Sequence, residues 1–173
     1  MPTMYDVLAR SLIEPVPERV AEDVRRARER NPRFSRAELV DSVVRRAALR
    51  SGAVAALAAA PSGWLSLLPV SADFSFQVLS LHRVALAVPQ ALRRRTSPAE
   101  RALATAASLA AAGASVWLRE KAIRSASRSL RRGPPPPVRS VVHAVIGGAL
   151  SAAAVLAIGK AARGYCRRVP PPR

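Results

Sequence analysis

The sequence predicts an all-α protein, an Ala-rich bundle of about six helices that includes apolar helical hairpins. Apolar residues recur at helical spacing along most of the 173-residue chain, and no alternating pattern typical of strands competes with them. Half of the residues are hydrophobic, but only 4% are aromatic. Ala supplies much of this apolar content, and Ala favours helices while burying little area per residue. We therefore expect a core that depends on many close contacts between helices.

The N-terminal segment, residues 1–34, predicts two polar helices. The first covers about residues 5–12 and follows a weak capping box formed by Thr3 and Asp6. The second covers about residues 18–30 and has a narrow apolar stripe with charged residues elsewhere. This stripe predicts a surface helix lying on another part of the protein, and it consists of Val20, Val24 and Ala27.

The third and fourth helices flank the most apolar turn of the chain. Ser35 and Glu38 form a capping box, which predicts a helix that extends to Ala60. Residues 51–72 contain no charge, but two prolines and a glycine interrupt them, so they predict a helix end, a turn and a new helix start. The turn contains Trp64, and the fourth helix follows it.

The fifth helix has the clearest start signal. Ser97 and Glu100 form a capping box with proline at the first helical position. Residues 102–118 are then uncharged, and a basic continuation is expected as far as Arg132, with Gly113 as a candidate break.

The sixth helix is expected to begin near Val138, after a glycine and four prolines that form a stiff connector. Its residues 140–159 carry no formal charge, and its end is basic. Residues 35–168 thus form one apolar and basic helical domain, and residues 169–173 form a Pro-rich tail.

The net charge of +17 lies entirely in the apolar part of the chain. Residues 1–41 contain eight acids and eight arginines, whereas residues 42–173 contain twenty Lys and Arg residues against three acids. A basic excess beside apolar segments indicates an anionic surface, either lipid headgroups or nucleic acid.

Three stretches together resemble the bacterial EcsC family and the related hydrophobic helical domains attached to some small GTPases. They are the capped helix FSRAELVDSVVRRAA, the helix start PVSADFSFQVLSLHRVALAV, and the glycine-rich helix VIGGALSAAAVLAIGKAARGY. The resemblance covers about residues 35–168 and maps the family motifs onto Pro69, Asp73 and Gln77 and onto the Gly147–Gly148 pair. It implies a membrane-associated protein, linked through the family name to an ABC transporter system, with no established reaction.

Three uncharged segments, residues 51–72, 102–118 and 140–159, approach the ~20 residues needed to cross a bilayer. Every flank of these segments is basic, so ordinary spans would place positive charge on the outer side, against the positive-inside bias. Two arrangements remain: hairpins that dip into the cytoplasmic leaflet, with Trp64 deepest, or a bundle that lies on it.

The residues expected to contact the membrane or its lipid headgroups are the tryptophan of the apolar turn and the bases that flank the apolar segments. They are Trp64, Arg93, Arg94, Arg95, Arg124, Arg128, Arg131, Arg132, Lys160, Arg163, Arg167 and Arg168.

Small residues recur every four positions in two of the apolar helices, which allows two helix backbones to approach closely. They serve either ordinary packing within the chain or a specific dimer. This helix-packing set comprises Gly52, Ala56 and Ala60, and Ala144, Gly147, Gly148 and Ala152.

The titratable residues of the apolar part have structural and functional interpretations. Asp73 either interacts with the positive end of a helix dipole or faces a polar cavity. His82 and His143 have no carboxylate at ligand spacing, which favours hydrogen-bonded roles over metal binding. Cys166 is the only cysteine, and we find no phosphate loop, nucleophile elbow or zinc motif. We therefore expect no catalytic activity, cofactor, metal or small-molecule substrate.

The sequence favours a helical protein that binds anionic lipids on the cytoplasmic face of a bacterial membrane. It is expected to be peripheral or inserted, either through the 51–91 hairpin alone or together with the 140–159 helix. The N-terminus lacks the features of a signal peptide, and the polar N-terminal helices are a candidate docking site for a protein partner. The alternative is a soluble bundle that binds a protein partner or nucleic acid. Nucleic acid is the less favoured of the two ligands because the aromatic residues stand in apolar stretches rather than among the bases.

Overall fold

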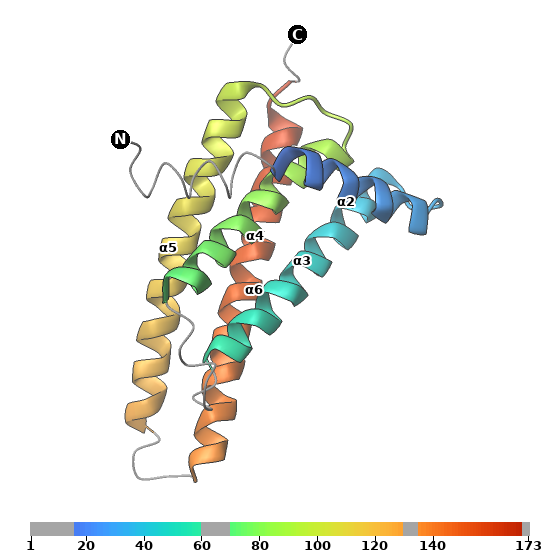
Figure 1. The fold of residues 1–173 in the computed structure, drawn as a ribbon. Coiled ribbons are helices and arrows are strands. Elements are labelled where there is room, and N and C mark those ends of the chain that lie inside the picture. Colours follow the sequence, from blue (N-terminus) through green and yellow to red (C-terminus); the bar gives the residue numbers. More distant parts are fainter. Residues whose placement is uncertain (1–15, 60–69, 130–134, 171–173) are drawn as a thin grey trace.

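The computed structural model describes residues 16–59, 70–129 and 135–170, which form five α-helices and no strand (Figure 1). The helices are α2 (Val16–Arg30), α3 (Arg36–Ala59), α4 (Val70–Ala91), α5 (Pro98–Ser129) and α6 (Pro136–Arg168). The predicted all-α class is confirmed, although the described helices are one fewer than the expected six. The helix predicted over residues 5–12 and the apolar turn around Trp64 lie outside the described residues.

Two helices start with the predicted capping boxes. At α3 the backbone N–H of Ser35 donates to Glu38 Oε2 at 2.7 Å, and the N–H of Glu38 donates to Ser35 Oγ at 3.3 Å. At α5 the corresponding distances between Ser97 and Glu100 are 2.9 and 3.2 Å. These reciprocal bonds satisfy amide groups that a helix start otherwise leaves without partners.

A glycine and a proline, residues that often interrupt helices, behave differently here. Gly113 does not interrupt α5, which continues as one helix into the basic segment. Pro89 lies inside α4, and α4 ends two residues later in a Schellman turn, where the N–H of Arg94 bonds to the carbonyl of Pro89 at 2.8 Å. The residue that occupies the left-handed position of this turn is Arg93, with φ of 58° instead of the usual glycine.

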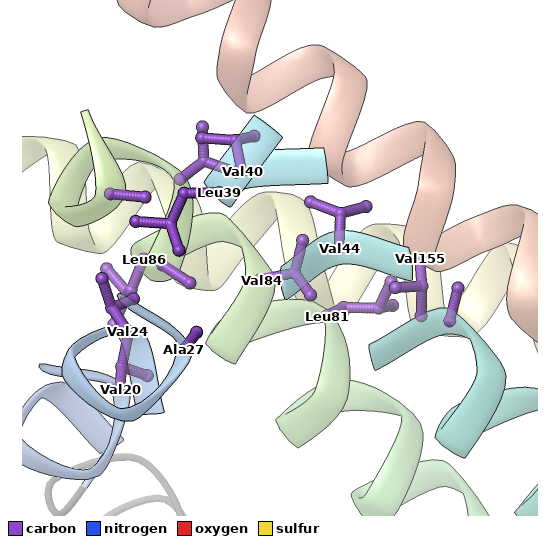
Figure 2. Close-up of a cluster of buried hydrophobic side chains, with 14 of the residues drawn as sticks. Val20, Val24, Ala27, Leu39, Val40, Val44, Leu81, Val84, Leu86 and Val155 are labelled. Atoms are coloured by element: carbon purple, nitrogen blue, oxygen red, sulfur yellow. The ribbon is translucent and has the colours of Figure 1, made fainter. Parts of the chain in front are cut away.

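The core lies where α4 meets α2, α3, α5 and α6. In Figure 1, α4 runs across the front of α6, between α5 and α3, and α2 crosses the upper part of α4. Figure 2 shows the buried side chains that α2, α3, α4 and α6 contribute to one cluster. The stripe predicted on the second helix is part of this cluster, so α2 packs against α3 and α4 even though it belongs to the polar N-terminal segment 1–34.

The burial of α4 bears on the expectation that the 51–91 hairpin enters the membrane, which stays a prediction because the turn of that hairpin lies outside the described residues. Leu81, Val84 and Val88 are at most 1% exposed, and their neighbours along the helix are similarly buried. Most apolar side chains from Val78 to Ala91 of α4 are therefore covered by the other helices of the bundle, whereas Phe74, Phe76 and Leu79 are partly exposed.

Candidate membrane-binding surface

The long helices α3 and α6 cross at glycines. A Cβ atom added to Gly52 would lie 3.0 Å from the carbonyl oxygen of Gly148, and one added to Gly148 would lie 2.8 Å from that of Gly52. Ala56 and Ala152, the next small residues along each helix, lie against the same contact. The small-residue faces of α3 and α6 therefore pack on each other within one chain.

The other members of the helix-packing set lie around this crossing or outside the described part. Gly147 is buried and Ala144 is half-buried on α6. Ala60 falls in the segment that the structure does not describe.

A buried polar cluster lies next to the glycine crossing. Ser51 Oγ and Ser151 Oγ donate to Gln77 Oε1 at 3.0 and 2.5 Å, and the two hydroxyl oxygens lie 2.9 Å apart. Gln77 Nε2 donates to Ser115 Oγ across a longer distance of 3.5 Å. This cluster joins α3, α4, α5 and α6, and it includes Gln77, one of the residues onto which the EcsC resemblance maps a family motif. Because its members satisfy one another inside the core, the cluster orients four helices.

The side chain of Arg94 is almost completely buried, which corrects its assignment to lipid headgroups. Its side chain is 7% exposed and forms an ion pair with Glu100. The same guanidinium donates to the carbonyl oxygen of Val169 at 2.5 Å and approaches that of Cys166 at 3.5 Å. Arg94 therefore satisfies carbonyl groups at the C-terminal end of α6, which a helix end otherwise leaves without partners.

The outward face of α5 is apolar along its first half and basic along its second. Eight of its exposed residues follow one another at spacings of three and four, so they form a single stripe along the helix. This α5 stripe consists of Leu103, Ala107, Ala110, Ala114 and Trp117, followed by Lys121, Arg124 and Arg128. Leu103 and Trp117 are 56% and 57% exposed, although side chains of this size are usually buried.

Trp117 and Lys121 stand where the apolar half of the α5 stripe becomes basic. The ammonium group of Lys121 lies 5.0 Å from the centre of the Trp117 ring, which is within the range of a cation–π interaction. Amphipathic tryptophans and long basic side chains favour the boundary between hydrocarbon and water. Neither Trp117 nor Lys121 was among the predicted headgroup contacts. Their spacing of four residues places them on one face of the helix, and this would have indicated a boundary between hydrocarbon and water.

The outward face of α6 has the same order of apolar and basic residues. Val141 and Val145 are 62% and 63% exposed, and the exposed positions continue through small and apolar residues to Leu156 before Lys160. In both α5 and α6 the most apolar part is only 17% buried, and both helices are long and apolar enough to cross a membrane by length and composition.

The uncharged parts of α5 and α6 are out of register. The hydroxyl of Tyr165 donates to Glu100 Oε1 at 3.2 Å, and Ser127 Oγ lies 2.9 Å from His143 Nε2, which fixes how the two antiparallel helices align. Residues 102–106 of α5 consequently lie beside the basic end of α6. The uncharged stretches overlap over about 12 residues, or ~18 Å of helix. This overlap is shorter than the ~30 Å hydrocarbon core of a bilayer.

The remaining predicted headgroup contacts are mostly exposed. Arg163 is an exception, since it donates to Asp41 Oδ1 at 2.8 Å and to the carbonyl of Ala37 at 3.2 Å. Arg124 is exposed but pairs with Glu120 on the same helix. The other exposed members are Arg93, Arg95, Arg128, Lys160, Arg167 and Arg168. Three members, Trp64, Arg131 and Arg132, and the side chain of Asp73 lie outside the described part of the chain.

The described residues contain no group of three or more His, Cys, Asp or Glu side chains that could hold a metal ion. Burial lowers the pKa of His82 and raises the pKa of the Cys166 thiol, so both groups favour their neutral forms. Comparison of this chain with protein families, with curated proteins and with solved structures gives no match.

Proposed function

We propose that the protein is a non-catalytic, membrane-associated helical protein that binds the anionic cytoplasmic leaflet of a bacterial membrane. The role is EcsC-like in the sense of the sequence resemblance, namely membrane association without a defined reaction. The observation that carries the proposal is the α5 stripe, which presents an exposed apolar surface continuous with an exposed basic one.

The charge pattern supports a bundle that lies on the leaflet. The basic half of the α5 stripe and the basic end of α6 stand at opposite ends of the antiparallel pair, so bases flank the apolar surface at both ends. A helix lying in the interface buries its apolar face among the acyl chains while its bases reach the headgroups. Crossing the bilayer as a pair would instead place charge from one helix beside hydrocarbon, because the uncharged stretches overlap over only ~18 Å.

The test is co-sedimentation with vesicles of phosphatidylcholine alone or mixed with phosphatidylglycerol. We expect binding to the anionic vesicles that weakens with salt. Replacing Lys121, Arg124 and Arg128 together by Gln should weaken it roughly a hundredfold, because each base near an anionic surface contributes about 1 kcal/mol. Trp117→Ala should weaken binding to both vesicle types by removing apolar contact.

A matched control removes equal charge elsewhere. Arg19 on α2, Arg33 in the connection to α3 and Arg36 at the start of α3 are all exposed. Their joint replacement by Gln should change vesicle binding far less. If both triple variants lost the same affinity for anionic vesicles, net charge alone would explain the binding. That result would contradict the assignment of the α5 stripe as the membrane-binding surface. Binding to duplex DNA but not to anionic vesicles would favour the soluble, nucleic-acid-binding alternative.

A further inference from the structure

Five arginines from three helices line one cleft on the side of the bundle formed by α2, α3 and α4. The cleft has a volume of about 310 Å³, at the lower end of the range for small-ligand sites. No residue of α5 or α6 lines it. The arginines of this cleft, which we call the arginine cleft, are Arg26 and Arg30 of α2, Arg46 and Arg50 of α3, and Arg83 of α4.

The charge of the arginine cleft is largely uncompensated. Asp23 is the one acid among its lining residues, and Arg26 pairs at 2.5 Å with Glu22 on the same helix. Among the described residues, the other four arginines form no ion pair with a carboxylate. Guanidinium groups that converge without counter-charges repel one another, so an anion bound among them would relieve that repulsion.

Arg83 supplies a second, independent indication of a ligand. It is the only arginine or lysine of α4, and its Nε atom is buried without a hydrogen-bond partner. A buried donor of this kind costs free energy unless an acceptor reaches it. The Arg83 side chain lines the cleft, so an anion bound there can accept from its guanidinium group beside those of α3.

The cleft also has an apolar wall. Phe76, Leu79 and Val84 of α4 line it together with Val43 and Ala47 of α3. A site that combines several guanidinium groups with aliphatic and aromatic side chains matches an amphiphile, which has an anionic end and a hydrocarbon stem.

We propose that the arginine cleft binds a phosphate group attached to a hydrocarbon chain. A phosphate has several acceptor oxygens and up to two negative charges, so it can engage guanidinium groups from α2, α3 and α4 together, whereas a carboxylate has two oxygens and one charge. The hydrocarbon stem packs on the apolar wall. This site is separate from the α5 stripe, so it goes beyond the membrane association proposed above.

The test is calorimetric titration with hexyl phosphate, with inorganic phosphate, hexanoate and hexanol as comparison probes. We expect saturable binding of hexyl phosphate at one site, at least about tenfold tighter than binding of any of the other three. Inorganic phosphate binding equally well would overturn the hydrocarbon part of the proposal. Hexanoate binding equally well would overturn the preference for phosphate, and hexanol binding equally well would overturn the role of the arginines.

Arg83→Gln and Arg46→Gln should each weaken hexyl phosphate binding by about tenfold or more while leaving the thermal midpoint of the free protein unchanged or raised. Exposed Arg95 offers a control, and Arg95→Gln should bind as the unaltered chain does. Unchanged affinity in both cleft variants would refute the site.

The two proposals fail independently. Arg83→Gln should still sediment with anionic vesicles, and the triple variant of the α5 stripe should still bind hexyl phosphate.

Discussion

The guanidinium of Arg94 lies over the ring of Tyr165, 5.4 Å from its centre, and both side chains meet the carboxylate of Glu100. Arg94 follows α4, Glu100 lies in the first turn of α5, and Tyr165 lies near the end of α6. The backbone N–H of Ser97 and then the guanidinium of Arg94 hold the pKa of Glu100 below its usual value. This contact therefore joins three helix ends through one ion pair that is kept charged.

Loss of this ion pair should destabilise the fold. Arg94→Gln leaves the largely buried Glu100 carboxylate without its partner, and the expected loss is about 2 kcal/mol of unfolding free energy. Urea unfolding followed by circular dichroism measures it. The neighbouring Arg95 is exposed, so Arg95→Gln should change the stability by less than about 0.5 kcal/mol. Equal effects of the two substitutions would mean that the Arg94 contact contributes nothing specific.

Replacing glycine by alanine should have opposite effects on stability at the crossing of α3 and α6 and at Gly113 on α5. Gly148→Ala places a methyl group 2.8 Å from the carbonyl oxygen of Gly52, so α3 and α6 must separate. We expect a loss of about 1–3 kcal/mol. Gly113 has open space around its Cβ position, so Gly113→Ala should stabilise α5 by about 0.5–1 kcal/mol. Thermal unfolding distinguishes these results, and a stabilising Gly148→Ala would refute the close approach.

The buried polar cluster predicts non-additive behaviour. Gln77→Leu leaves the hydroxyls of Ser51 and Ser151 with only each other, and we expect a loss of about 1–3 kcal/mol. Adding Ser51→Ala and Ser151→Ala removes those two hydroxyls and should restore part of the stability, since the Ser115 hydroxyl is then the one cluster member that has lost its Gln77 partner. Denaturant midpoints of the single and triple variants measure the coupling. If the triple variant loses as much stability as the three single variants lose in total, the side chains act separately.

Because the His82 side chain is buried, we expect the folded protein to lose stability in mild acid. Burial lowers its pKa, and its Nδ1 atom has no hydrogen-bond partner. In the unfolded chain a histidine has a pKa of about 6.5. Below this pH the unfolded chain therefore binds a proton that the folded chain does not bind until the pH reaches the lower pKa of buried His82. The contribution of His82 to stability is complete above about pH 6.5 and falls with decreasing pH, by at most about 1.4 kcal/mol per pH unit.

Urea unfolding at pH 7.5, 6.5 and 5.5 tests this dependence. The loss between pH 6.5 and 5.5 should disappear in His82→Gln. A variant that keeps the same slope over this interval would assign the loss to other groups.

The sequence by itself determined the helices of this protein, because helix starts and ends depend on neighbouring residues. The capping boxes at Ser35 and Ser97 predicted the starts of α3 and α5, since an N-cap acts within one turn. The excess of positive charge beside apolar segments was likewise visible from composition alone.

Only the tertiary structure decided which of these residues reach solvent. Arg93, Arg94 and Arg95 are chemically identical neighbours, and the Schellman turn at the end of α4 directs Arg94 alone into the molecule. The sequence also offered both α4 and α5 as apolar helices, but packing buried α4 and left the α5 stripe exposed. In the sequence, the arginine cleft is visible only as two separate pairs of arginines spaced by four residues, because its members come from α2, α3 and α4. Such convergence depends on contacts between distant parts of the chain, which no local pattern specifies.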